Sequence, residues 1–398
     1  MPDSWLECLV CRAQCDIGPR FGGCPECVER QQKAPLEVRY DYRHTSLPKP
    51  DRRNSGIWRW RRMLPPLDAS AIVSLHEGNT PLVELKSCPV LLKNETLNPT
   101  WSYKDRANSV SISMARQLGF RNVAAVSTGN HGAAAAAYSA AGGRRCVVFC
   151  HEDAPDQQLA LMQLYGATVF RGGRRDDMLR GLVVRGDWFP DCILCPRGGC
   201  ANPFGIEGFK TIAFEIFEQL EGKVPDRVFV PVGSGDGLYG IWKGFCELQQ
   251  IGIADRAPRM YACQAAGADP YVRAFRAGAS RLTALESVHT IALSIAEKIG
   301  GEQALQAVYD SAGAALRASD EEILQAARCL AREGYALEPA SAAALACAQA
   351  LAHDRFGSEI WVAIGTGATV KWPETLNSGF NRSEKLPADF DRVEELLS

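Results

Sequence analysis

The residue best suited to chemistry in this sequence is Lys104, within the stretch Asn-Pro-Thr-Trp-Ser-Tyr-Lys-Asp-Arg at residues 98–106. The opening Asn-Pro-Thr is a turn and helix N-cap signal, and apolar residues recur at every fourth position behind the stretch (Val110, Met114 and Leu118). We therefore expect the lysine in the first turn of a helix, where the positive end of the helix dipole disfavours ammonium and lowers the amine pKa. Such a lysine is either a solvated surface residue or an amine that attacks a carbonyl to form a Schiff base.

Two glycine-containing loops follow predicted strands, and each could hold an anion. Residues 127–132 read Ser-Thr-Gly-Asn-His-Gly and open an alanine-rich helix, whereas residues 231–237 read Pro-Val-Gly-Ser-Gly-Asp-Gly and precede another helix. Backbone N–H groups exposed at a helix N-terminus attract carboxylate or phosphate. Taken alone, either loop is also compatible with an ordinary glycine turn. The second loop has no Walker lysine, which argues against a nucleoside triphosphate site.

Four cysteines near the N-terminus have the spacing of metal ligands. Cys8-x-x-Cys11 and Cys24-Pro-Glu-Cys27 are separated by twelve residues, and such paired knuckles can place four thiolates around zinc. A redox or disulfide pair is the alternative, and it is less compatible with two regular knuckles in a chain of cytosolic character. Few aromatic residues accompany the nearby arginines, so we expect a structural zinc site rather than a nucleic-acid module.

The elements that must position these groups alternate between apolar strands and helices. Strands are expected at 90–92, 123–126, 145–150, 168–171, 192–195, 228–232, 259–263 and 360–364. Helices are expected after Ser102, Asn130 and Pro155, around 176–184, and at 207–220, 238–248, 320–333 and 339–352. Apolar strands separated by helices indicate parallel sheets covered on both faces. We predict an α/β fold with two parallel-sheet units and a cleft between them: a larger unit at 31–88 and 206–398, a smaller unit at 89–205, and a zinc ribbon at 1–30.

Composition and charge narrow the classes of partner. The chain has 398 residues, 46% hydrophobic and 23% charged, with a formal net charge of −2. This balance offers no broad basic surface for nucleic acid or anionic membranes, and no apolar run approaches the roughly 20 residues needed to span a bilayer. The first thirty residues do not have the pattern of a signal or transit peptide. We therefore expect a cytoplasmic protein with a small-molecule substrate and neither nucleic-acid nor membrane partners.

Residues 98–106 resemble the Schiff-base segment of threonine synthases, which belong to the fold-type II pyridoxal-phosphate enzymes. Further stretches resemble the same family: Glu77-Gly-Asn-Thr-Pro-Leu82, residues 127–132, residues 231–237 and Ile364-Gly-Thr-Gly-Ala-Thr-Val-Lys-Trp-Pro373. Together the matching stretches cover most of residues 75–373. The resemblance implies the fold-type II architecture, a pyridoxal 5′-phosphate cofactor and a homodimer. Many threonine synthase-like sequences carry a similar N-terminal ribbon.

The resemblance also implies a role for each matched residue. Lys104 would hold the cofactor as an imine and act as general base, while Asn130 would hydrogen-bond the cofactor's phenolic oxygen and Thr366 would face its pyridine nitrogen. The substrate α-carboxylate would be gripped by Ser127, Thr128, Gly129 and His131. The cofactor phosphate would lie on Gly233, Ser234, Gly235, Asp236 and Gly237, with the Asp236 side chain pointing away. Glu338-Pro-Ala-Ser-Ala342 resembles a family segment near the cofactor ring, or is only a helix start.

The departures from the family pattern concern the substrate. Where threonine synthases carry an asparagine-serine pair and an arginine that contact the phosphate of O-phosphohomoserine, this chain has Gly199, Cys200 and Gly205. Losing a guanidinium removes a strong contact to a dianion, so a less cationic pocket is expected. Trp101 replaces a glycine three residues before the lysine, and it would narrow the pocket or offer a stacking wall to the substrate. Ser234 replaces an asparagine, and Ala368 with Thr369 replaces a histidine-glycine pair.

These residues lead to one main functional hypothesis and two alternatives. The main one is a threonine synthase-like enzyme that uses pyridoxal phosphate for elimination or replacement at the β or γ carbon of an amino acid. The first alternative is a divergent replacement enzyme or lyase of specialised metabolism that acts on a non-phosphorylated amino acid. The second is a non-catalytic scaffold or regulator that binds through its zinc ribbon.

Overall fold

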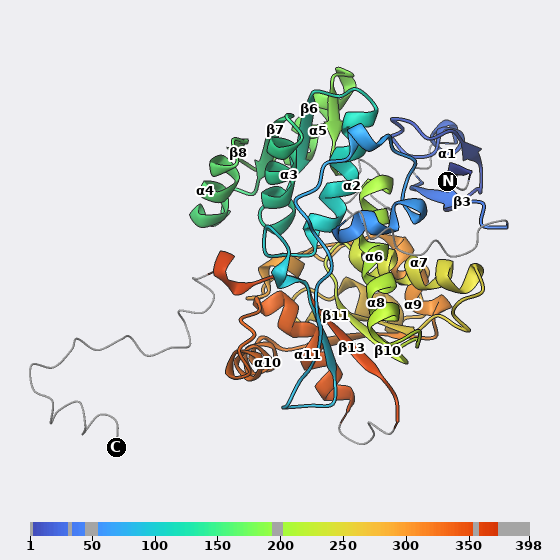
Figure 1. Cartoon of the computed structure of the whole chain (residues 1–398). Helices are drawn as coiled ribbons and strands as arrows, with labels where there is room; N and C mark the ends of the chain where they lie inside the picture. The colour runs from blue at the N-terminus through green and yellow to red at the C-terminus, as the bar shows by residue number, and fades with distance from the viewer. Residues whose placement is uncertain (1–2, 31–33, 44–54, 193–201, 353–357, 373–398) are drawn as a thin grey trace, which may run out of the picture.

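The computed structural model describes residues 3–30, 34–43, 55–192, 202–352 and 358–372. Three sheets organise these residues (Figure 1). A small antiparallel sheet of β1 (Ser4–Cys8), β2 (Gln14–Cys15) and β3 (Leu36–Tyr40) lies with α1 (Pro25–Glu29) at one side of the body. The other two sheets are parallel apart from one edge strand, which confirms the predicted α/β class.

The larger parallel sheet has six strands in the order β12-β11-β10-β13-β5-β4. The strands are β4 (Leu82–Glu84), β5 (Leu91–Asn94), β10 (Arg227–Pro231), β11 (Arg259–Ala265), β12 (Ala314–Ala318) and β13 (Trp361–Gly365), with only β4 antiparallel. Neighbouring residues of β10 point to opposite faces, since Phe229 packs in one apolar cluster and Val228 and Val230 in another. Helices α10 (Asp320–Arg332) and α11 (Pro339–Leu351) supply the first cluster, whereas α7 (Asp236–Gln250) and α9 (Glu302–Asp310) supply the second. Because both faces of this sheet are buried, its strands are apolar along their length and do not alternate with polar residues.

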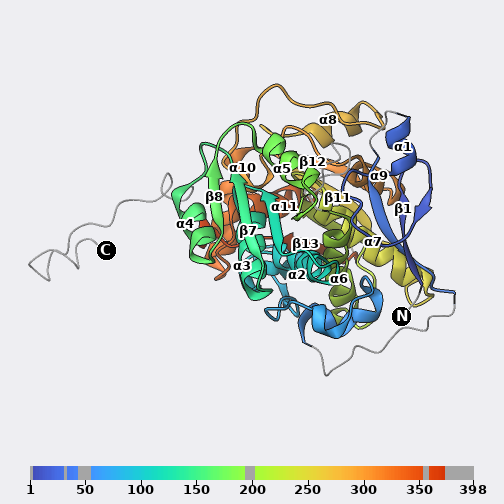
Figure 2. The same ribbon diagram turned by 90° about the horizontal axis from the view of Figure 1, so that it is seen from above.

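The smaller sheet has four parallel strands in the order β8-β7-β6-β9. Its strands are β6 (Asn122–Val126), β7 (Arg145–Cys150), β8 (Thr168–Arg171) and β9 (Trp188–Pro190). Helices α3 (Asn130–Ala141), α4 (Asp156–Leu164) and α5 (Arg175–Val184) connect and cover them, as the view from above shows (Figure 2). The strand expected at 192–195 is wrong in position: it ends at Pro190, and residues 193–195 lie outside the described residues. Pro190 is tolerated in this edge strand because the ladder does not use its missing N–H: the next residue, Asp191, donates to the carbonyl of Ala124 at 2.9 Å.

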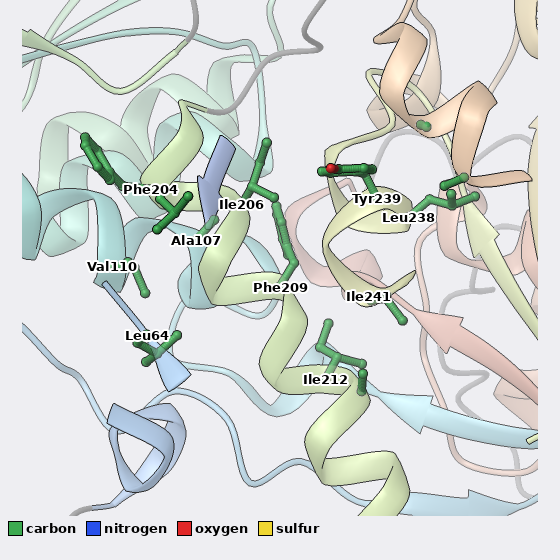
Figure 3. Close-up of a cluster of buried hydrophobic side chains, with 14 of the residues drawn as sticks. Leu64, Ala107, Val110, Phe204, Ile206, Phe209, Ile212, Leu238, Tyr239 and Ile241 are labelled. Carbon is green, nitrogen blue, oxygen red and sulfur yellow. The ribbon is translucent and has the colours of Figure 1, made fainter. Parts of the chain in front are cut away.

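Three helices pack side by side between the sheets. Helix α6 (Pro203–Gln219) lies between α2 (Lys104–Gln117) and α7, and side chains of all three interleave around Phe209 (Figure 3). Helices α2 and α6 approach closely at Gly208, where an added Cβ would lie 2.0 Å from the carbonyl oxygen of Arg106. Only glycine permits this contact, so the first turn of α2 is held against α6.

A buried ionic cluster, which we call the Arg106 cluster, joins α2 to the larger sheet. It contains Arg106, Lys93, Glu95 and Glu215, and all four side chains are fully buried. Arg106 Nε donates to Glu95 Oε2 at 2.6 Å, and Nη2 donates to Glu215 Oε2 at 2.7 Å. Lys93 Nζ donates to the same Glu215 oxygen at 2.8 Å. Two cations face two carboxylates, so the cluster carries no net charge.

A second ionic cluster fastens the N-terminal sheet to the body. Tyr40 of β3 donates from Oη to Glu207 Oε2 at 2.6 Å, and Tyr42 donates to Glu247 Oε2 at 2.8 Å. The Nζ group of Lys210 lies between those two carboxylates, 2.6 Å from Glu207 Oε2 and 3.0 Å from Glu247 Oε2. Lys243 donates to Glu207 and to the backbone carbonyl of Val38. The contacts tie β3 to α6 and α7 through buried charges.

The sheets cross two of the expected unit boundaries. The expected smaller unit begins at residue 89, but β5 pairs with β13 in the six-stranded sheet. The expected ribbon ends at residue 30, but β3 pairs with β1 in the N-terminal sheet. β12, α8 (Pro270–Arg276) and α9 were not expected from the sequence. Within the described residues, no helix is both long and apolar enough to cross a membrane.

Candidate active site

Lys104 is the first residue of α2, in the helical first turn that the sequence predicts. Its Nζ lies 5.2 Å from the centre of the Tyr103 ring and 5.3 Å from that of Phe209. The backbone N–H of Tyr103 donates to the carbonyl of Thr366 at 2.9 Å, which joins the start of α2 to the end of β13. Two aromatic walls and a strand end therefore fix where the amine lies.

The predicted N-cap for this helix is wrong. Tyr103 holds the cap position without a side-chain hydrogen bond, and Asn98 instead ends a short 3-10 helix. Thr100, which precedes the helix, is instead bound by a residue inside it. The carboxylate of Asp105 accepts from the backbone N–H of Thr100 at 2.8 Å and from its hydroxyl at 2.7 Å. Burial raises the pKa of the Asp105 carboxyl to about 7. The turn before Lys104 is thus stabilised by a carboxylate inside the helix rather than by a residue that precedes it.

The loop at residues 127–132 connects β6 to α3 and folds around one hydroxyl. Ser127 Oγ accepts from the N–H groups of Gly129 at 3.3 Å and of Gly132 at 2.9 Å. Gly129 packs against the indole of Trp372, because an added Cβ there would lie 2.7 Å from Trp372 Cζ2. Both contacts use the Ser127 hydroxyl as an acceptor, so they hold the loop in shape and do not use the O–H proton, which is the part of the group that can donate to an anion.

Asn130, the first residue of α3, faces the larger unit. Its Nδ2 donates to both oxygens of Glu338, at 2.9 and 3.0 Å, and burial raises the pKa of that carboxyl above its usual range. Asn130 Oδ1 is buried and has no hydrogen-bond partner among the described residues. Glu338 is both the N-cap residue of α11 and the partner of Asn130.

His131 does not present its side chain in the way a carboxylate-binding residue would. The ring is buried, with Nε2 3.2 Å from Asp191 Oδ2 and Nδ1 3.4 Å from Asn108 Nδ2. Burial, together with the charge of Lys104, lowers the His131 pKa to about 3, so the ring is neutral. Thr128 lies nearer the surface and is 3.4 Å, through Oγ1, from Nη1 of Arg175.

The loop at residues 233–237 forms a turn that tolerates little beyond glycine. Gly235 has φ +96°, and an added Cβ would lie 2.3 Å from the hydroxyl oxygen of Tyr271. An added Cβ at Gly237 would lie 2.5 Å from the Tyr103 ring. Ser234 Oγ donates to Asp236 Oδ2 at 2.6 Å, so the carboxylate is bound beside the loop. The bare backbone at the N-terminus of α7 is shaped to admit an anion.

Thr366 follows β13 and is paired with a residue that the sequence did not single out. Its hydroxyl lies 3.0 Å from Ser341 Oγ of α11, and Ser341 also accepts from the N–H of Gly367 at 2.8 Å. Trp101 adopts φ +59°, a left-handed conformation rare for a bulky residue, and is 40% exposed. Its carbonyl accepts from the N–H of Ala368 at 2.9 Å, which places it at the same strand end as Thr366.

These groups form one site with a composition that fits pyridoxal phosphate. Lys104 offers an amine, the loop at 233–237 an anion cradle that a side chain would fill, Asn130 an unsatisfied buried oxygen, and Thr366 a neutral hydroxyl. Position 205 lies inside α6, as glycine, whereas positions 199 and 200 are outside the described residues. The contacts of Glu338, Ser341, Asp191 and Arg175 were missed, because they join segments far apart in the chain.

The four predicted metal ligands lie together. Sulfur atoms of Cys8 and Cys27 are 3.8 Å apart and those of Cys11 and Cys24 are 3.6 Å apart, and all four lie within 4.8 Å of one another. A tetrahedron with Zn–S bonds of about 2.3 Å has edges of about 3.8 Å, so the four sulfur positions fit zinc. Gly23, with φ +91°, permits the close approach of the chain before the second knuckle.

Comparison with known proteins agrees with this geometry. The family described as "Pyridoxal-phosphate dependent enzyme" matches residues 73–367. A threonine synthase of Methanocaldococcus jannaschii is 38% identical, and one of Methanosarcina acetivorans is 33% identical; each match covers 98% of both chains. Among solved structures, a threonine deaminase from T.th. is 25% identical with a TM-score of 0.61, covering 77% of this chain and 94% of that one. The chain therefore belongs to the pyridoxal-phosphate dependent enzymes, and is a threonine synthase-like member of that family.

Proposed function

We propose that Lys104 holds pyridoxal phosphate covalently, and that the enzyme removes or replaces a group at the β or γ carbon of an amino acid, as a threonine synthase-like enzyme does. One observation carries the assignment of residues. The start of α2 lies beside the ends of β10 and β13, because Tyr103 donates to the carbonyl of Thr366 and its ring packs against Gly237. The C-terminal edge of parallel strands is where α/β enzymes bind ligands.

Each residue then has a stated task. The N–H groups of residues 233–237 hold the cofactor's phosphate, Thr366 faces the pyridine nitrogen, and Asn130 hydrogen-bonds the phenolic oxygen. The segment 127–131 holds the substrate α-carboxylate, chiefly by backbone N–H groups, since the His131 ring is turned toward Asp191. When bound, the cofactor withdraws electrons from the substrate Cα and makes its proton acidic. Lys104 Nζ takes that proton and returns it later, while the Phe209 and Tyr103 rings exclude water.

Borohydride treatment of the purified protein, followed by peptide mass analysis, tests the attachment. We expect a yellow protein whose cofactor becomes fixed on the peptide that contains Lys104, and a Lys104→Ala variant that is neither coloured nor labelled. Lys223→Ala removes an exposed lysine and should behave as the wild type. Colourless wild-type protein, or label on another lysine, would overturn the assignment.

O-Phosphohomoserine tests the reaction. Release of phosphate together with formation of threonine by the cofactor-loaded protein would establish a threonine synthase. Trp101 favours the second candidate, an enzyme for a non-phosphorylated amino acid, because its strained backbone displays an indole at the site. That candidate predicts cofactor spectral changes with a neutral amino acid and none with O-phosphohomoserine.

We further propose that Cys8, Cys11, Cys24 and Cys27 bind a structural zinc ion, and that the chain is a cytoplasmic homodimer without nucleic-acid or membrane partners. The sulfur separations support the zinc, and the resemblance to threonine synthases supports the dimer. We propose that the larger parallel sheet belongs to a cofactor domain, which includes β5, and that the smaller sheet belongs to a substrate-carboxylate domain.

A further inference from the structure

A short segment that follows β13 contacts both halves of the site. Residues 368–372, which we call the strap, contain one 3-10 turn, η5 (Thr369–Lys371), and form the last red turn in Figure 1. The side chains of Lys371 and Trp372, at the end of the strap, are both buried. The strap therefore packs inside the protein, directly after the strand end that carries Thr366.

The strap is bound to the turn that precedes Lys104. The N–H of Ala368 donates to the carbonyl of Trp101 at 2.9 Å. Lys371 Nζ donates to the carbonyl of Thr100 at 2.7 Å. These two hydrogen bonds fix the strap relative to the turn from which α2 begins, and so relative to the backbone of Lys104.

The strap also contacts two elements that cover the smaller sheet. Gln158 of α4 is fully buried and donates from Nε2 to the carbonyl of Lys371 at 2.9 Å. The indole of Trp372 lies against Gly129, the N-cap residue of α3, because a Cβ added to that glycine would be 2.7 Å from Cζ2 and 2.9 Å from Cη2. Gly129 belongs to the loop at 127–132, so the indole supports the loop that we assign to the substrate α-carboxylate.

We propose that Trp372 and Gln158 are positioning residues for recognition of the substrate α-carboxylate. The inference rests on the proposed function, in which the substrate amine lies near Lys104 and the loop at 127–131 holds the carboxylate. Amine and carboxylate are bonded to the same carbon, so both are bound well only when the loop lies at one separation from Lys104. The strap contacts the loop and the turn before Lys104, and thereby sets that separation. A displacement of about 1 Å in such a site can cost about a hundredfold in rate.

Two substitutions test the role of the strap without changing any charge. Trp372→Ala opens space beside Gly129, so that the loop can move away from the substrate. Gln158→Leu removes the hydrogen bond to the strap with little change in side-chain size. Since both variants are neutral, a weaker carboxylate contact cannot be attributed to lost electrostatic attraction. Both act through the same segment, so the double variant should lose little more than either single variant.

The experiment compares L-threonine with L-threoninamide, which has the same amine and side chain but no carboxylate. Calorimetry on the cofactor-loaded protein gives both affinities, and cofactor absorbance reports contact with the amine. We expect the wild type to bind threonine at least about tenfold more tightly than the amide, because hydrogen bonds to a charged group are the stronger ones. Trp372→Ala and Gln158→Leu should each reduce this preference at least about threefold and leave the affinity for the amide nearly unchanged.

Three further variants serve as comparisons. Trp372→Phe keeps an aromatic ring beside Gly129 and should retain more of the preference than Trp372→Ala. Trp188→Ala and Gln163→Leu are the matched controls, and both should retain the wild-type preference. Trp188 is half-buried at the start of β9, at the end of the strand away from the loop, and Gln163 is exposed on α4.

The outcomes separate this inference from the proposed function. A preference that falls in Trp372→Ala and in Gln158→Leu, with the affinity for the amide retained, supports the inference. A preference that either variant retains, or an equal weakening of threonine and amide, would overturn the inference and leave the proposed function standing, since the strap would then act only on the structure as a whole. Wild-type protein whose absorbance changes with neither compound would contradict the proposed function, and the inference with it.

Discussion

Replacing Arg106 by glutamine should cost more free energy of unfolding than almost any other single polar change in this protein. Arg106 donates to Glu95 and Glu215 by four hydrogen bonds of 2.6 to 2.9 Å, and to the hydroxyls of Thr80 and Thr211 at 3.1 and 3.0 Å. All of its donors are used, and the side chain is fully buried.

The charges of the Arg106 cluster determine how much free energy of unfolding the substitution should cost. With arginine present, two cations face two carboxylates; with glutamine, Glu95 and Glu215 share only Lys93. Removing one partner of a buried ion pair typically costs about 3–5 kcal/mol, because the remaining charge stays desolvated. A glutamine amide can restore only some of the lost hydrogen bonds. We therefore expect Arg106→Gln to lower the free energy of unfolding by about 3–5 kcal/mol near neutral pH.

Urea unfolding followed by circular dichroism measures this loss, with Arg43→Gln as the control. Arg43 pairs with Asp41 but is 82% exposed, so its removal should leave the free energy of unfolding nearly unchanged. The loss for Arg106→Gln should shrink at acidic pH, since an unpaired buried carboxyl has a raised pKa and takes up a proton there. A loss below about 1 kcal/mol, or one that is independent of pH, would refute the reasoning.

Three further predictions concern other sites. Trp101→Gly should be more stable than Trp101→Ala by about 1 kcal/mol in urea unfolding, because both lose the indole but only glycine adopts φ +59° without strain; equal stabilities would contradict that strain. Burial raises the pKa of the Asp191 carboxyl from 3.8 to about 7, so ionisation of this group destabilises the folded state increasingly as pH rises through that interval. Asp191→Asn should therefore gain stability relative to the wild type between about pH 5 and pH 8, and a constant difference would argue against the shift. Metal analysis should find one zinc per chain, lost in Cys27→Ser with a lower melting temperature but retained in Cys15→Ser, whose sulfur lies outside the cluster; zinc-free wild-type protein would refute the site.

The sequence predicts best those features that a short segment determines by itself. The loops at 127–132 and 233–237 could be placed at strand ends because an apolar run, glycines and a helix follow one another directly. Lys104 could be placed in a first helical turn from the spacing behind it. The four cysteines could be grouped because metal ligation leaves a fixed spacing.

Features made by distant segments left no such pattern. Nothing near Asn130 indicates that its amide meets Glu338, and nothing near Thr366 indicates Ser341, because these pairs form only when α11 packs beside the end of β13. The N-cap before Lys104 was misplaced for a related reason: Asp105, inside the helix, competes for Thr100.

The second ionic cluster, which ties β3 to α6 and α7, has a consequence for any attempt to truncate the N-terminal part of this protein. The N-terminal sheet with its four clustered cysteines looks like a module that could be deleted or transplanted, but a deletion that removed β3 with it would leave Glu207, Lys210, Lys243 and Glu247 open to water. The two helices that carry these charges also supply Phe209 and Gly237 beside Lys104. We therefore expect that a shortened chain would retain cofactor poorly although every residue that contacts it is still present, and that a viable truncation would need apolar replacements at these four positions.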